Sequence, residues 1–162
     1  MPHRTPVLRR TLVSFLAVAA LTLAGCVSVS RAAPPSVQTS VVNLVNAHRA
    51  NVGLPPVYQC GTLNGAAQGQ SNYQASIATM THDGGGGLGA RANNAGYRGW
   101  NNLGENVAYG YPGVTEVVDA WLASPGHRAN LLSTNFTHLG IGLAYHGSTP
   151  YWTQDFGRGG TC

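Results

Sequence analysis

Residues 117–132 read "VVDAWLASPGHRANLL", and this stretch decides the fold that the sequence predicts. A helix ends at Pro125, because the residue before a proline avoids helical backbone angles and the ring removes a hydrogen-bond donor. His127 then opens a second predicted helix, directly after the stiff Ser-Pro-Gly turn. The first helix is amphipathic, since its apolar residues recur at helical spacing: Val114, Val117, Val118, Trp121 and Leu122. The stretch therefore places a titratable side chain, His127, directly after a core-facing helix, at a position where the local helix pattern does not require a histidine.

Two more helical patterns lie upstream. The first is ended by "VGLPP" (52–56), and its stripe includes His48, which predicts a core histidine. The second is predicted over residues 63–80, and residues 82–100 follow as a glycine-rich loop with one short helix near Ala90. The two predicted apolar faces are Val41, Leu44, Val45 and His48, and then Leu63, Ala66, Tyr73, Ile77 and Met80.

Strand patterns dominate the last third of the chain. "ENVAYG" (105–110) is a short candidate, and "HLGIGLAYH" (138–146) and "YWTQDFG" (151–157) alternate in the way of half-buried strands. Because helices come mostly first and strands last, the order favours an α+β domain in which helices cover a small antiparallel sheet.

The charge of the chain is concentrated at its start. All nine basic residues are arginines, and Arg4, Arg9 and Arg10 precede the first apolar run. From Cys26 onward six arginines face five acidic residues, a net charge of +1. Such a protein has no basic field for nucleic acid or for an anionic membrane surface. With no lysine, it also has no lysine-based covalent chemistry.

The N-terminus is predicted to be a targeting segment. A basic stretch and an apolar run too short to span a bilayer form a signal peptide over residues 1–25. It ends in "LAGC" (23–26), which resembles the bacterial lipobox, where the cysteine is diacylated and holds the protein to the membrane. Residues 26–37 are then the lipidated cysteine and a flexible tether. The alternative is cleavage near "SRAA" (30–33), which discards Cys26 and leaves a secreted protein.

Cysteine count agrees with export. Three cysteines leave one odd, and if Cys26 carries lipid, Cys60 and Cys162 remain as a disulfide pair in an oxidising compartment. We therefore expect the protein on the outer face of a bacterial membrane or at the cell surface, or otherwise secreted.

Three side chains at the ends of predicted elements are candidates for chemistry: His82, Glu105 and His127. Two histidines and a glutamate can bind a divalent metal such as zinc or magnesium and leave a position open for water. Alternatively, Glu105 acts as a general base with a histidine as the acid. The simpler alternatives are that the histidines cap helices and that Glu105 accepts backbone hydrogen bonds. Gln154 and Asp155 are further polar candidates on a strand, and we expect no organic cofactor.

The motifs together resemble the CAP superfamily, the SCP-like or cysteine-rich secretory and pathogenesis-related type, in its bacterial branch. The resemblance covers roughly residues 38–157 of a domain over residues 38–162. It is carried, in order, by "LVNAHRANVGLPPV", "AAQGQSNYQASIATMTHDG", "AGYRGWNNLGENVAYG", "VVDAWLASPGHRANLL", "FTHLGIGLAY" and "YWTQDFG". It implies an α-β-α sandwich with a small antiparallel sheet between helical layers.

The resemblance also implies that His127, His82 and Glu105 line a central cavity as catalytic or metal-binding residues. Many eukaryotic members have a second glutamate three residues after the helix tryptophan, and here that position is Ser124. The set of two histidines and two glutamates is therefore incomplete. The residues expected beside the cavity are Ser124, Asn106 and Gln154.

Three functions follow from the resemblance, and a shared fold does not choose among them. The first is a membrane-anchored binding module that holds a metal and a lipid, cell-wall glycan, peptide or host ligand. The second is a hydrolase of peptide, ester or phosphoester bonds, and the third is a scaffold with a vestigial cavity. The aromatic residues that suit a ligand surface are Tyr97, Trp100, Tyr109 and Tyr111.

Overall fold

The computed structural model describes residues 1–3 and 34–162, and the compact unit begins at Pro34. Apart from residues 1–3, the predicted signal peptide lies outside the described residues, and so does the predicted lipidation site, Cys26. Among the described residues, no helix combines the length and the apolar character that crossing a membrane requires.

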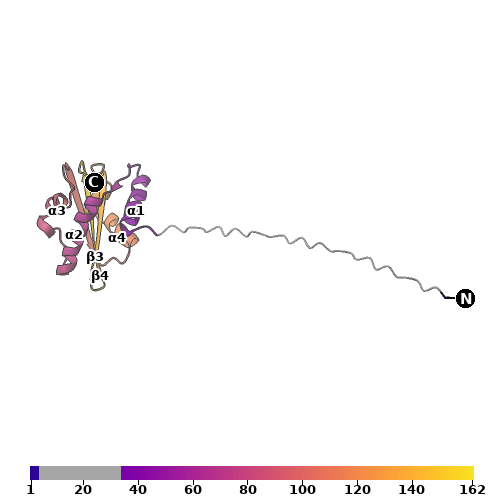
Figure 1. Cartoon of the computed structure of the whole chain (residues 1–162). Coiled ribbons are helices and arrows are strands. Elements are labelled where there is room, and N and C mark those ends of the chain that lie inside the picture. The colour runs from indigo at the N-terminus through magenta and orange to yellow at the C-terminus, as the bar shows by residue number, and fades with distance from the viewer. Residues whose placement is uncertain (4–33) are drawn as a thin grey trace. The chain divides into compact units, whose positions relative to one another are not determined.

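The domain is an α+β sandwich, as predicted. A four-stranded sheet in the order β1-β3-β4-β2 lies between α2 and α3 on one side and α1 and α4 on the other (Figure 1). β1 pairs with β3 in parallel, so the sheet is mixed and the antiparallel prediction holds only for the other pairs. The described helices are α1 (Val37–Asn51), α2 (Gly61–Ile77), the 3-10 turn η1 (Gly84–Gly86), α3 (Leu88–Asn94), α4 (Val114–Ala123) and α5 (Pro125–Leu131). The strands are β1 (Tyr58–Gln59), β2 (Asn102–Tyr109), β3 (His138–His146) and β4 (Thr149–Arg158).

Helix α1 differs from its prediction in its start and in its buried face. It begins at Val37, inside the predicted tether, because the hydroxyl of Ser36 accepts a hydrogen bond from the Thr39 amide and caps the helix. Arg49, and not His48, is its buried polar residue. The Arg49 guanidinium turns inward because it donates hydrogen bonds to three carbonyls that no strand or helix satisfies: those of Pro55, Leu131 and Ser133.

Helix α2 ends at Ile77, three residues before the predicted end at Met80. Leu63 and Ala66 are buried as predicted, whereas Tyr73, Ile77 and Met80 are exposed. Apart from Leu63, the face that α2 buries is made of small and amide side chains. The reason is the close approach of α2 to β3: a Cβ atom at Gly140 or Gly142 would collide with the backbone of α2. At these two glycines of β3 the helix leaves no room for a side chain.

The main apolar core lies on the opposite face of the sheet, against α1, α4 and α5. Trp121 of α4 and Trp152 of β4 are its largest fully buried side chains. The predicted disulfide between Cys60 and Cys162 is confirmed, with the two Cα atoms 5.1 Å apart. It ties the start of α2 to the chain end.

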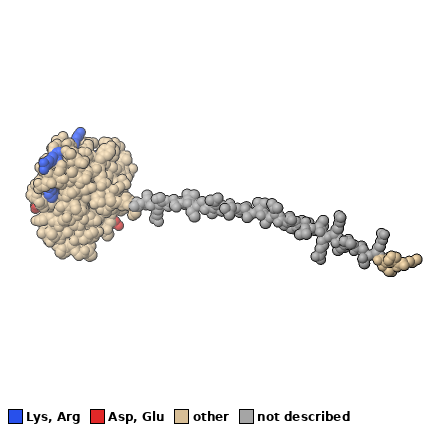
Figure 2. All heavy atoms as spheres, viewed as in Figure 1, with Lys and Arg blue, Asp and Glu red and all other residues tan. Residues whose placement is uncertain are grey.

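Figure 2 shows few charged side chains on the visible face, with arginines gathered towards one end.

Candidate functional site

Two of the three predicted site residues, His82 and Glu105, form a hydrogen-bonded pair. His82 Nδ1 lies 2.7 Å from Glu105 Oε1, and the Arg91 guanidinium donates to Glu105 Oε2. The side chains of Glu105 and Arg91 are only 4% and 5% exposed, whereas that of His82 is 58% exposed. Both oxygens of the buried carboxylate are therefore occupied, and the imidazole presents its other nitrogen to solvent.

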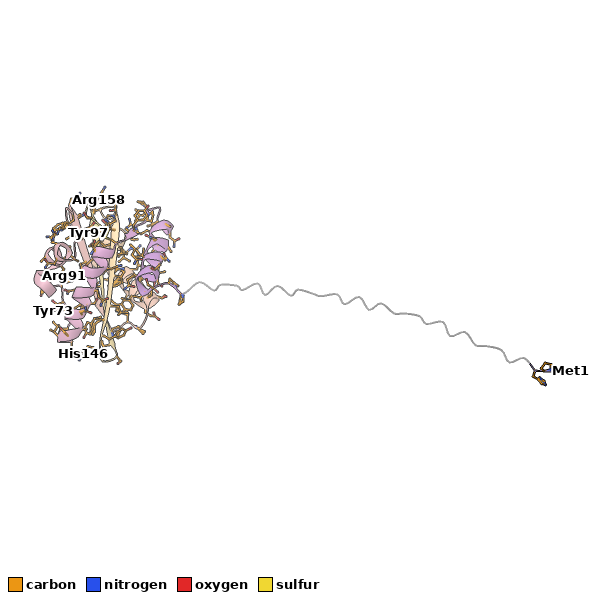
Figure 3. The ribbon with its side chains drawn as sticks, in the orientation of Figure 1. Met1, Tyr73, Arg91, Tyr97, His146 and Arg158 are labelled. Atoms are coloured by element: carbon orange, nitrogen blue, oxygen red, sulfur yellow. A yellow bond between two sulfur atoms is a disulfide. The ribbon has the colours of Figure 1, made fainter. Side chains whose placement is uncertain are left out.

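Arg91 is a site residue that the sequence analysis missed. Besides Glu105, its guanidinium holds the carbonyls of His82 and Gly84, so one side chain of α3 fixes the loop that carries His82. Figure 3 shows Arg91 on the side of the domain occupied by α2 and α3. The available signal was electrostatic: a buried carboxylate needs a buried cation, and this chain has few arginines to supply it.

Two glutamine side chains of α2 form hydrogen bonds to the backbone of the same loop. The amide nitrogen of Gln70 donates to the Thr81 carbonyl, and the amide oxygen of Gln74 accepts from the Thr81 N–H at 3.3 Å. Both glutamines are fully buried. They satisfy the backbone of Thr81 much as a neighbouring strand would and set the position of the next residue, His82. No sequence pattern singled them out, because glutamine on a helix is usually exposed.

Asp155 faces Glu105 from the neighbouring strand. The two are register partners in the β2–β4 pair, and Asp155 is fully buried. Neither Asp155 oxygen has a hydrogen-bond partner within residues 34–162. Burial, and then the charge of Glu105, raise the pKa of Asp155 well above its ordinary value. The site thus contains one carboxylate held by donors and one acid group that favours its neutral form.

Asn106 and Gln154, expected beside the cavity, support His127 from the other face of the sheet. Successive strand residues point to opposite faces, so these two neighbours of Glu105 and Asp155 face α5. Asn106 Nδ2 donates to the Gln154 side-chain oxygen at 3.0 Å and to the His127 carbonyl at 3.1 Å. Neither side chain is among those that line the cleft described next. Their contact is with the backbone at the start of α5, which positions His127.

His127 itself lines a cleft beside the free edge of β2. The cavity measures about 210 Å³ and lies between α4, α5 and the chain that follows α2. Burial, and then the proximity of His82, lower the pKa of His127, so its imidazole is neutral at pH 7. Ser124 lines this cleft, whereas His82 and Glu105, which were expected to share a cavity with His127, do not. The lining residues are Met80, Val107, Ala108, Tyr109, Tyr111, Ala120, Trp121, Ser124 and His127.

The donors present do not complete a metal site. Among the described residues, no three histidine, cysteine or acidic side chains converge on one point. Glu105 is engaged by His82 and Arg91, which leaves the two imidazoles of His82 and His127 as donors. Catalytic zinc takes three protein ligands. The predicted third ligand would have to leave Arg91 before it could bind a metal.

The aromatic residues proposed for a ligand surface divide into two groups. Tyr97 is fully buried and its hydroxyl pairs with His138 Nδ1 at 2.9 Å, while the Trp100 indole donates to Asn93. Figure 3 shows Tyr97 near the end of the domain where Arg158 lies. These two are packing residues. Tyr109 and Tyr111 are 54% and 37% exposed and stand at the mouth of the cleft.

Comparison with known proteins places these features in context. The family model described as CAP, cysteine-rich secretory protein family, matches residues 42–156. An uncharacterized protein of Bacillus subtilis, YkwD, is 37% identical over 129 residues, which cover 76% of this chain and 49% of YkwD. The uncharacterized membrane protein YlbC of the same species is 42% identical over 57 residues, or 35% of this chain and 15% of YlbC. This chain thus spans about half the length of the first relative.

Two solved structures have folds similar to that of this chain. An extracellular protein from Bacillus anthracis that contains an SCP domain aligns with a TM-score of 0.68 and 30% identity, covering 75% of this chain and 40% of that one. An outer surface protein of Borrelia burgdorferi aligns with a TM-score of 0.67 and 21% identity, covering 74% and 90%. The second similarity concerns the fold alone.

Proposed function

This chain belongs to the CAP family of cysteine-rich secretory proteins, and from that premise we propose that it is a binding module outside the cytoplasm, whose ligand occupies the cleft at His127. Three observations support export. The chain begins with a basic and apolar segment, it forms a disulfide between Cys60 and Cys162, and the similar Bacillus anthracis protein is described as extracellular. Acylation of Cys26 would hold the domain at the outer face of the membrane.

The observation that carries the proposal is the composition of the cleft. Its lining is mostly apolar, chiefly Val107, Ala120 and Trp121, and the other lining residues with polar side-chain atoms are Ser124, His127 and two tyrosines. Ligand sites are typically of this kind, apolar with a few polar groups that fix orientation. No arginine, aspartate or glutamate lines the cleft, and His127 is neutral, so the group that enters is uncharged.

The size of the cleft limits what enters. At about 210 Å³ it is smaller than the roughly 300–1,000 Å³ that encloses a whole drug-sized molecule. We therefore propose that the cleft holds one apolar group of a larger extracellular ligand, and not the whole ligand. The Trp152 indole donates to the Tyr111 carbonyl at 2.9 Å and fixes the chain at the mouth. Divalent-metal binding by His82 and His127 stays a separate prediction.

The test is occupancy of the cleft by a small apolar probe. We expect benzyl alcohol to shift the NMR signals of the Trp121 indole and the His127 ring in a saturable way. Ala120→Phe fills the cleft and abolishes the shifts. Ala123→Phe places the same side chain on the exposed end of α4, outside the cleft, and leaves them intact. Shifts spread over the whole surface, or unaffected by Ala120→Phe, would contradict the proposal.

A hydrolase is the second candidate, and the His82–Glu105 pair favours it. A carboxylate that holds one imidazole nitrogen orients the other as a proton acceptor, and His82 exposes that nitrogen to solvent. Glu105, the base expected from the sequence, then acts as the orienting group. His82→Ala leaves the buried Glu105–Arg91 pair intact and should abolish hydrolysis of p-nitrophenyl acetate in a folded protein. Equal turnover by wild type and variant would exclude this role.

A further inference from the structure

The outer edge of β2 carries unpaired backbone groups beside the cleft. β2 is the last strand of the sheet, and β4 is its only strand neighbour among the described residues. The Gly110 N–H donates to the Pro150 carbonyl, which fixes the even-numbered residues as those bonded to β4. In an antiparallel strand the alternate residues point both backbone groups the other way. The odd-numbered residues of β2 therefore face outward.

Side chains cap this edge along most of its length. The Trp121 indole donates to the Val107 carbonyl at 3.3 Å, and the Asn130 amide donates to the Glu105 carbonyl at 3.2 Å. Both bonds confirm that odd-numbered carbonyls face outward. Val107 is also only 2% exposed, so no other chain reaches the edge there.

The edge becomes free at Tyr109. Its N–H and its carbonyl point away from β4, and neither has a hydrogen-bond partner in the part of the chain that the structure describes. Tyr109 is 54% exposed, its ring stacks on Tyr151, and it lines the cleft together with Tyr111. An unpaired strand donor and acceptor of an exposed residue thus stand next to a mostly apolar cavity.

We propose that the ligand is an extended polypeptide, which pairs with the backbone of Tyr109 and inserts one uncharged apolar side chain into the cleft. The inference rests on the proposed function of the cleft. Pairing with a free sheet edge supplies main-chain hydrogen bonds, and a pocket for an alternate side chain supplies specificity. A lipid would leave the Tyr109 donor and acceptor unpaired, and a glycan lacks the regular amide spacing that matches a strand.

Two blocked pentapeptides test the proposal on the purified protein by NMR titration. Acetyl-Thr-Val-Phe-Val-Thr-amide should shift the Tyr109 and Tyr111 amides and the Trp121 indole. The peptide with aspartate in place of phenylalanine should bind at least about tenfold more weakly, because the cleft is uncharged. A series of the phenylalanine peptide, each member N-methylated at one backbone nitrogen, locates the strand pairing. Methylation of the one amide that pairs with Tyr109 should weaken binding about tenfold. These comparisons use the wild-type protein, so no variant has to fold.

The outcomes separate this inference from the function on which it rests. If benzyl alcohol fills the cleft and no peptide binds, the peptide inference is wrong and the cleft remains a ligand site. If chitotetraose shifts the same signals and the peptides do not, the ligand is a glycan. If every N-methylated peptide binds as well as its parent, strand pairing is excluded. If neither peptide nor alcohol binds, both proposals fall.

Discussion

Glu105 and Asp155 are opposite residues of β2 and β4, both are buried, and only Glu105 has hydrogen-bond donors. One buried cation, Arg91, is directed at Glu105. The protein thus stabilises one carboxylate and leaves its neighbour to favour the neutral form, as two close carboxyl groups that share a site are expected to do.

Asp155→Asn should stabilise the protein near neutral pH. The folded state raises the pKa of Asp155 above 3.8, so above about pH 4 the folded state binds more protons than the unfolded state. Stability from this group is full below that pH and declines as the pH rises towards the folded pKa, by up to about 1.4 kcal/mol per pH unit. Asparagine mimics the neutral acid and removes the decline.

Urea unfolding of wild type and Asp155→Asn at pH 4, 5.5 and 7 measures this difference. The gap in unfolding free energy should widen with pH. The lowered pKa values of His127 and His138 act in the opposite direction, reducing stability below pH 6.5, but they are common to both proteins and cancel. A gap that stays constant would show that Asp155 is ionised in the folded protein.

Arg91→Ala should destabilise the domain by about 3–5 kcal/mol, because it leaves the buried Glu105 carboxylate without its cation and frees the carbonyls of His82 and Gly84. Denaturant unfolding checks the value. Arg98→Ala, at an exposed arginine seven residues on, is the matched control and should change stability by less than about 0.5 kcal/mol. Equal effects of the two variants would mean that the Arg91–Glu105 pair is dispensable.

Two glycine variants should have opposite effects. Gly140→Ala should prevent stable folding, because its Cβ atom would collide with the backbone of Leu63. Gly69→Ala lies inside α2 with no atom within 4 Å of the added carbon, so it should stabilise by about 0.5–1 kcal/mol. Thermal unfolding of both measures the contrast. A well-folded Gly140→Ala protein would contradict the close approach of α2 to β3.

Replacing both Cys60 and Cys162 with serine should cost about 2–5 kcal/mol, since the bond spans 102 residues and restricts the unfolded chain. Denaturant unfolding of the double variant and of the oxidised wild-type protein measures this difference in unfolding free energy. The reduced wild-type protein should match the variant. A loss of less than 1 kcal/mol would mean that the unfolded chain stays compact near the chain end.

Zinc should bind more weakly than about 1 μM, because His82 and His127 provide two ligands and Glu105 is held by Arg91. Calorimetric titration of wild type and of the His82→Ala/His127→Ala double variant tests this. Tighter binding that the double variant loses would mean that Glu105 leaves Arg91 and becomes the third ligand.

Local pattern was sufficient for most elements. The apolar spacing that ends at Pro125 predicted α4 and the break before α5, and alternation predicted β3 and β4. Helix α5 begins at Pro125 and not at the predicted His127, because proline suits the first position of a helix. It failed where long-range contacts decide burial. Arg49 replaced His48 on the inner face of α1 because carbonyls 82 and 84 residues away need its donors. Tyr73, Ile77 and Met80 stayed exposed because α2 turns its small and amide side chains, with Leu63, into the domain instead.

For the candidate site, the sequence by itself determined which reactive side chains exist and that His82 and His127 lie near helix ends. The prediction that Glu105 opens a strand was wrong, because residues 102–104 also pair with β4 and Glu105 lies inside β2. The tertiary structure alone decided their partners. Alternation along β2 sends Glu105 to the face where Arg91 and His82 meet it and sends Asn106 to the face of α5. Each of these side chains is buried, and a buried charge or amide needs a hydrogen-bond partner. The partners come from residues that are distant in the sequence, so only the tertiary structure could identify them.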